Sequence, residues 1–75
     1  MQHNLVGSRI RQARLAERPK ATLSDLSARL EILGVSLSVS EISRIETSER
    51  AVTDIQLMAF AKALKVPVTW LLGLD

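Results

Sequence analysis

Four serines, at positions 36, 38, 40 and 43, are the side chains whose type and spacing could carry chemistry, as nucleophiles. A serine nucleophile needs a neighbouring base, and the chain has one histidine, His3, and no His–carboxylate pair. It also has no cysteine, no glycine-rich phosphate loop and no residues at metal-ligand spacing. We therefore expect no enzymatic activity, no cofactor and no metal site.

The segment around these serines has the pattern of a helix with a free polar face. Ser38 and Glu41 form a capping box, and Leu37 with Ile42 supplies the hydrophobic staple that fixes the entry of the chain into a helix. The apolar positions of this helix are Ile42 and Ile45. The side chains left facing away from the core are then Val39, Ser40, Ser43, Arg44 and Thr47. Such a face, short and polar with one arginine, is open to a partner.

Two helices are expected before this segment. Asn4 as an N-cap and Pro19 as a breaker bound a helix over about Leu5–Glu17, with apolar positions that recur at helical spacing. Thr22, followed three residues later by an aspartate, begins a second helix that runs to about residue 33. Gly34 stands where a residue with positive φ would end it.

Two more helices are expected after it. Thr53 with Gln56 is a further capping box, and Ile55–Leu64 is apolar almost all round, so this helix is expected to be central and buried. Pro67 breaks it, and one last helical turn fits within residues 69–73. No stretch of useful length alternates as a strand does. The sequence therefore predicts an all-α fold of five helices.

Length and charge limit what such a chain can be. A chain of 75 residues supports one domain, here residues 1–75, with residues 1–4 expected to fray. No apolar run reaches the length of a membrane span and the start lacks the features of a signal peptide, so we expect a soluble cytoplasmic protein. Residues 1–30 carry six basic and two acidic side chains. This basic end is compatible with a polyanion partner or with a solubilised helix face.

The order of helices and one local motif resemble a known family. Residues 42–46, Ile-Ser-Arg-Ile-Glu, look like the signature that closes the recognition helix of phage lambda repressor/Cro-like helix-turn-helix regulators, the XRE family. Residues 7–14 look like the first helix of that family, and residues 53–64 and 66–72 look like its fourth and fifth. The resemblance covers about residues 5–73. It implies a compact five-helix lambda repressor-like DNA-binding domain whose helix-turn-helix is formed by the second and third helices.

The family resemblance also implies roles for individual residues. It places the third helix in the major groove of double-stranded DNA, and the residues that would face the bases are Val39, Ser40, Ser43 and Arg44. Thr22 and Arg50 would contact phosphates. Arg14 and Glu46 occupy positions that form a buried structural ion pair in the family.

Several positions depart from the family pattern. Leu23 replaces a glutamine that supports the recognition helix, and Ser48 and Glu49 replace a glycine and a basic residue that usually follow it. Because Glu49 would repel a phosphate, we expect the electrostatic share of DNA binding to be small. Glu41 could accept a hydrogen bond from a cytosine, but its capping position favours a structural role.

The apolar C-terminal run is too rich for one short helix to bury alone. We expect part of it to close a symmetric homodimer, as in the family, through Trp70, Leu71 and Leu74, with Leu72 beside them. The predicted function is sequence-specific binding of double-stranded DNA by a small, nucleoid-associated transcriptional regulator, a repressor. The alternative is a protein-interaction or antitoxin-like module on the same fold.

Overall fold

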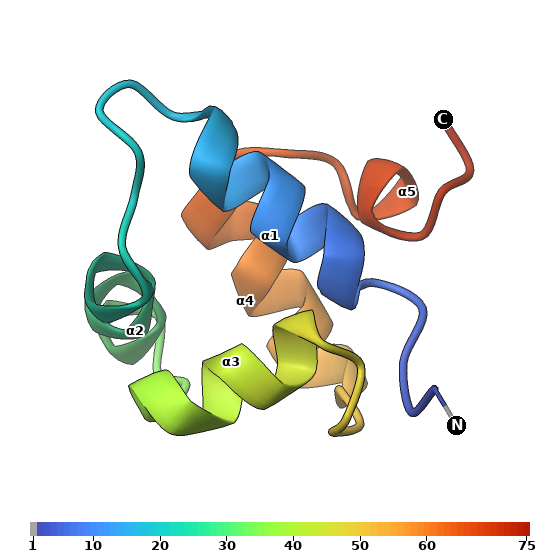
Figure 1. Cartoon of the computed structure of the whole chain (residues 1–75), viewed down its shortest axis with the longest axis horizontal. Coiled ribbons are helices and arrows are strands. Elements are labelled where there is room, and N and C mark those ends of the chain that lie inside the picture. The colour runs from blue at the N-terminus through green and yellow to red at the C-terminus, as the bar shows by residue number, and fades with distance from the viewer. Residues whose placement is uncertain (1) are drawn as a thin grey trace.

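Five α-helices follow one another in the computed structural model, which describes residues 2–75. They are α1 (Gly7–Ala16), α2 (Leu23–Ile32), α3 (Val39–Glu46), α4 (Asp54–Leu64) and α5 (Val68–Leu71). Figure 1 shows α1 and α4 at the centre of the molecule, with α2 and α5 on opposite sides of them. No strand occurs in the described residues. The predicted all-α class and the five-helix order are confirmed.

Three of the helices begin at the capping boxes expected from the sequence. The hydroxyls of Thr22, Ser38 and Thr53 accept hydrogen bonds of 3.0–3.1 Å from the backbone N–H three residues later. In each case the side chain of that later residue accepts a hydrogen bond from the N–H of the capping residue. Two backbone donors are satisfied at each start, so α2, α3 and α4 begin within one residue of the expected place. Gly34 ends α2 with φ 86°, in the left-handed region.

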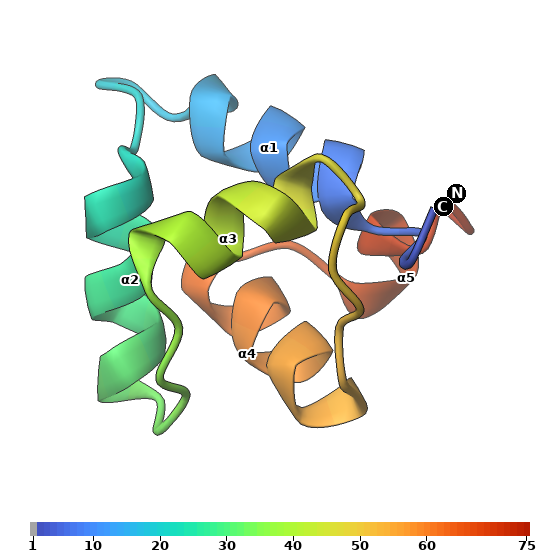
Figure 2. The ribbon, with the colours of Figure 1, turned by 60° about the horizontal axis from the view of Figure 1, so that its bottom comes forward.

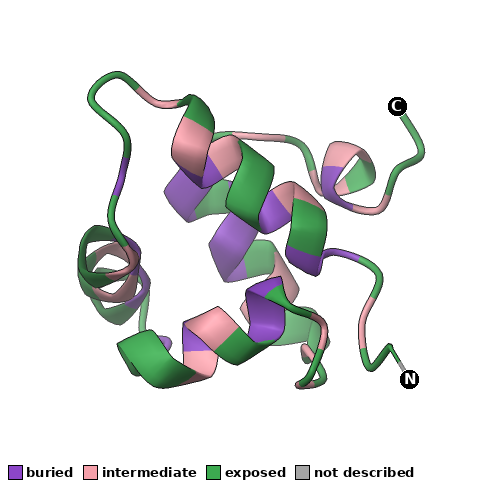
Figure 3. Cartoon of the chain, in the orientation of Figure 1, coloured by how far each residue is buried: buried purple, intermediate pink, exposed green. Residues whose placement is uncertain are grey.

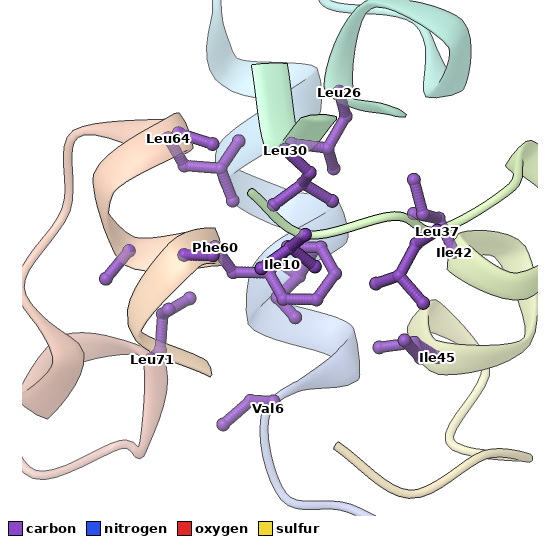
Figure 4. Close-up of a cluster of buried hydrophobic side chains, with 14 residues drawn as sticks. Val6, Ile10, Leu26, Leu30, Leu37, Ile42, Ile45, Phe60, Leu64 and Leu71 are labelled. Carbon is purple, nitrogen blue, oxygen red and sulfur yellow. The ribbon is translucent and has the colours of Figure 1, made fainter. Parts of the chain in front are cut away.

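The core is built around one aromatic side chain, Phe60 of α4. Figure 4 shows side chains from all five helices converging on its ring. The largest fully buried side chains are Phe60, Ile10, Leu26, Leu30, Ile42, Ile45 and Leu71. Because both isoleucines of α3 point into this core, the opposite side of α3 is left to solvent (Figure 3).

Two expectations about burial need correction. The side chains of Ile55 and Met58 on α4 are 71% and 55% exposed, so this helix is not buried all round. The physical reason is that α4 packs mainly against α1, α2 and α5, and within residues 2–75 no helix covers the side that carries Ile55 and Met58. Leu71 is fully buried within the chain and therefore cannot line a dimer interface.

The start of the chain also differs from expectation. The carboxamide oxygen of Asn4 accepts hydrogen bonds from the backbone N–H groups of Val6 and Gly7, at 3.0 and 2.7 Å. Its amide nitrogen donates to the carbonyls of Ile45 and Arg50, at 3.1 and 2.7 Å. The backbone N–H of residue 3 donates to the carbonyl of residue 48. The expected fraying of residues 1–4 is wrong for residues 3 and 4, which are tied to the end of α3.

Gly7 allows α1 to begin directly against the end of α3. A Cβ atom at this position would overlap the carbonyl oxygen of Ile45 and lie 3.0 Å from that of Glu46. The two backbones are therefore in contact without an intervening side chain. This contact and the Asn4 hydrogen bonds fix the orientation of α3 relative to α1.

Candidate nucleic-acid interface

Helices α2 and α3 form a helix-turn-helix unit. Figure 2 shows the N-terminal end of α3 beside α2, with the rest of α3 running away from α2. The hydroxyl of Ser27 on α2 donates a 2.6 Å hydrogen bond to the carbonyl of Leu37, which is buried. The turn is thus held to α2 immediately before α3 begins.

The outer side of α3 carries the four residues expected to face a partner. Val39, Ser40 and Arg44 are exposed and Ser43 is half-buried. Among residues 2–75, Arg44 takes part in no ion pair. The structure therefore brings these four side chains together on one solvent-facing side, with a free guanidinium among them.

The inner side of α3 is fixed by a buried charge pair. The Nε of Arg14 lies 2.7 Å from one carboxylate oxygen of Glu46, and its Nη2 lies 2.9 Å from the other. The two side chains are only 10% and 4% exposed, and Nη1 of Arg14 donates to the carbonyl of Ala21. The hydrogen bonds that Arg14 donates to the Glu46 carboxylate raise the pKa of its guanidinium, against the effect of burial. The pair implied by the family resemblance is formed, and its role is to join α1 to α3.

A second charge pair lies beside the outer side of α3, and sequence reasoning missed it. Nη1 of Arg50 lies 2.6 Å from Oε2 of Glu41, and both side chains are about one-third exposed. The other carboxylate oxygen of Glu41 accepts the hydrogen bond from Ser38 in the capping box. The Ser38 backbone N–H, followed by Arg50, lowers the pKa of the Glu41 carboxyl. Arg50, expected at a phosphate, is therefore already partnered by a carboxylate.

Two further groups lie near the ends of these helices. Thr22 is exposed at the first turn of α2, where it caps the helix. At the other end of α3, the hydroxyl of Thr47 donates a 2.6 Å hydrogen bond to the carboxylate of Glu49. A negative charge is thus held at the C-terminal end of α3, as the departures from the family pattern suggested.

The C-terminal run is divided between the core and the surface. Trp70 is half-buried, and the guanidinium of Arg9 lies 4.9 Å from the centre of its ring. Such a contact stabilises both groups. Leu72 is half-buried and Leu74 is 72% exposed. Of the residues expected at a dimer interface, Leu74 is mostly exposed and Trp70 is partly exposed.

Residues 2–75 contain neither a metal-binding cluster nor a membrane-spanning helix. No group of three or more His, Asp or Glu side chains there is placed to hold a metal ion. No helix in that part of the chain is long and apolar enough to cross a membrane.

Comparison with known proteins agrees with this geometry. A family model described as helix-turn-helix matches residues 10–71, from the first helix to the last. No curated protein and no solved structure matches the chain. The matched family is one of DNA-binding regulators and not a family of enzymes. Its model covers most of the chain and includes the α2–α3 unit and the buried Arg14–Glu46 pair, so this chain belongs to the lambda repressor/Cro-like XRE family of DNA-binding helix-turn-helix regulators.

Proposed function

We propose that the protein is a sequence-specific transcriptional repressor that reads the major groove of double-stranded DNA with α3. The observation that carries this proposal is the division of α3 into two sides. Ile42, Ile45 and Glu46 hold the inner side in the core, while the outer side presents small side chains and the free guanidinium of Arg44. A repressor of this kind would act on chromosomal DNA and lie with the nucleoid.

The chemistry of the outer side fits the groove. An α-helix enters the roughly 12 Å wide major groove of B-DNA, and short side chains on its first turn let the backbone come close. Ser40 and Ser43 can donate to or accept from base edges, and Val39 can contact a thymine methyl group. Arg44 can pair with O6 and N7 of guanine through two hydrogen bonds.

The surroundings of α3 supply anchors for the DNA backbone. The first turn of α2 presents the Thr22 hydroxyl and the N–H groups of Leu23 and Ser24, which the capping box does not use. The partial positive charge of the helix N-terminus favours a phosphate there, against the charge of Asp25. Arg50 lies on the loop after α3 and can turn toward a phosphate if it leaves Glu41. These contacts would set the register in which Arg44 meets a base.

Arg44→Ala and Arg50→Ala are expected to weaken DNA binding in different ways. Arg44→Ala should lower affinity for the preferred duplex by ~1–3 kcal/mol and relax the preference at one base position, because a base contact is lost. Arg50→Ala should weaken all duplexes about equally and lower the slope of log K against log salt by at most ~1, because a phosphate contact is lost. A gel-shift selection from random duplexes, followed by titration at several salt concentrations, measures both effects.

The same selection separates the proposal from its alternative. If no duplex binds more tightly than random DNA at low salt, sequence-specific reading is wrong and a protein-interaction or antitoxin-like role takes its place. Loss of a protein partner on Arg44→Ala would then show that the outer side of α3 binds protein.

Glu41→Gln is expected to strengthen binding to DNA of any sequence. Glutamine keeps the oxygen that the capping box needs but removes the charge that holds Arg50. The freed guanidinium should make the salt slope steeper, by the part of about 1 that Arg50→Ala does not remove from the wild-type slope. The matched control is Glu31→Gln, which makes the same charge change at an exposed residue in the last turn of α2. The effect of Glu41→Gln should vanish in an Arg50→Ala background; if it persists, the pair does not restrain DNA binding.

We further propose that the regulator binds a palindromic site as a homodimer that closes over the C-terminal surface. The exposed Leu74 and the outer edge of Trp70 are the apolar groups available there. Leu74→Asp should then abolish the dimer in analytical sedimentation and weaken binding to a palindromic duplex. Ile32→Asp, which also replaces an exposed aliphatic side chain by a carboxylate but on α2, should leave the dimer intact. A wild-type protein that stays monomeric at high concentration, alone and on the duplex, contradicts the proposal.

A further inference from the structure

A second surface, formed by α4 and the end of α2, has no role in the proposed reading of DNA. Along α4, Ile55, Met58 and Lys62 are spaced by three and four residues and therefore lie on one stripe, about 10 Å long. Ile32 and Leu33 lie beside it, and Ile32 is 85% exposed. We call these five residues the α4 strip. Four of its members are large apolar side chains open to solvent, which a small protein rarely leaves uncovered together.

The α4 strip is hollowed, with Leu33 and Lys62 at its centre. One hollow of about 210 Å³ is lined by Leu33, Ile55 and Met58 among others. An adjoining hollow of about 530 Å³ is lined by Ile32 and Leu33 and by residues 62–65 at the C-terminal end of α4. Leu33 and Lys62 line both. A molecule that fills the two hollows must therefore cover the side chain of Lys62.

The charges around these hollows are not balanced. Glu17 and Arg29 line the larger hollow and neutralise each other through two contacts of 2.8 Å. Lys62 and Lys65 also line it, and within residues 2–75 neither forms an ion pair. Covering an ammonium group without an anion beside it is strongly unfavourable. The occupant of the strip must therefore bring carboxylates.

The shape selects the kind of occupant. An apolar stripe two helical turns long, with adjoining hollows, is complementary to a helix whose apolar side chains recur at three- and four-residue spacing. Met58 adds a flexible side chain that can adjust to such a partner. A second copy of this chain related by a two-fold axis would instead bring Lys62 toward Lys62, which is repulsive.

We propose that the α4 strip is a docking site for an acidic amphipathic helix of a partner protein. The apolar face of that helix lies on Ile55, Met58 and Leu33, and its carboxylates meet Lys62 and Lys65. The strip shares no residue with the outer side of α3, so the partner helix and the DNA would use different side chains.

The test is a selection with displayed helical peptides whose apolar positions are fixed at three- and four-residue spacing and whose flanking positions are random. The probe is that library, presented to the folded 75-residue chain. We expect the selected peptides to carry Asp or Glu at one edge. Their affinity should fall at least tenfold on Met58→Asp and on Lys62→Glu. Both positions are exposed, so both variants are expected to fold, which circular dichroism checks.

A matched control and a charge exchange make the result specific. Lys20→Glu, the same reversal at an exposed lysine outside the strip, should leave peptide affinity unchanged. Replacing the selected peptide's acids by lysine should restore binding to the Lys62→Glu variant. The proposal is overturned if no peptide is enriched, if the enriched peptides lack acidic residues, or if their affinity is unchanged by Lys62→Glu. It is also overturned if Met58→Asp abolishes self-association of the chain, or if the strip binds phosphatidylglycerol vesicles in place of peptides. None of these outcomes depends on whether DNA is bound.

Discussion

Replacing Glu46 by Ala should lower the free energy of unfolding by ~3–5 kcal/mol, which is a large part of the stability of a domain of this size. The carboxylate takes both hydrogen bonds from Arg14, and both residues are buried. Its removal leaves a guanidinium with one remaining acceptor, the carbonyl of Ala21, in a place where water cannot replace the lost oxygens. Urea titration followed by circular dichroism measures the loss.

Two variants show whether burial is the cause. Glu17→Ala breaks the geometrically similar pair with Arg29, but those side chains are 32% and 37% exposed, so the loss should be roughly 0–1 kcal/mol. The double change of Arg14 and Glu46 to Leu removes both charges and should recover much of the stability lost in Glu46→Ala. Equal losses for Glu17→Ala and Glu46→Ala would mean that the Arg14 pair is effectively solvated.

Gly7→Ala should destabilise the fold by about 3 kcal/mol or more, the upper end of the range for overpacked positions. In an ordinary helix this change is favourable, because alanine has the higher helix propensity. Here the added methyl group overlaps the carbonyl oxygen of Ile45, which is backbone and cannot rotate away. α1 must then move away from the end of α3, which also strains the Asn4 hydrogen bonds.

Gly34→Ala is the control for this position. Gly34 has φ 86°, and no atom lies within 4 Å of a Cβ added there. Gly34→Ala should therefore lower the free energy of unfolding by only ~1 kcal/mol, the cost of alanine in the left-handed region. Thermal unfolding of both variants gives the comparison. If Gly7→Ala is no more harmful than Gly34→Ala, the close approach of α1 to α3 does not contribute to stability.

Local signals account for the parts of the fold that could be predicted. Each capping box lies within four consecutive residues, so Thr22, Ser38 and Thr53 predicted where α2, α3 and α4 begin without knowledge of the fold. The exposure of Ile55 and Met58 was mispredicted because it does not depend on local sequence. Apolar spacing shows that a helix can be buried all round, but whether another element covers each side depends on the tertiary arrangement.

The candidate site likewise has parts that local sequence predicts and parts that depend on contacts between distant residues. The outer side of α3 could be predicted because it is what remains when Ile42 and Ile45 face the core. The Glu41–Arg50 pair and the hydrogen bonds that Asn4 donates to Ile45 and Arg50 could not, because they join residues 9 to 46 positions apart and depend on the path of the loop after α3. A glycine one turn before the first core residue of α1 was the available signal for the close approach at Gly7.

The two-sided construction of α3 also bears on how such a regulator can evolve. The inner side of α3 contacts α1 as well as the core, so a change at Ile45 or at Glu46 lowers stability unless the residue it contacts changes with it. Its outer side contributes little to folding, and exposed positions of this kind usually tolerate substitution within about 0.5 kcal/mol. Val39, Ser40 and Arg44 can therefore be exchanged almost freely, and duplicated copies of the gene could acquire new recognition preferences through a few substitutions while the scaffold stays the same.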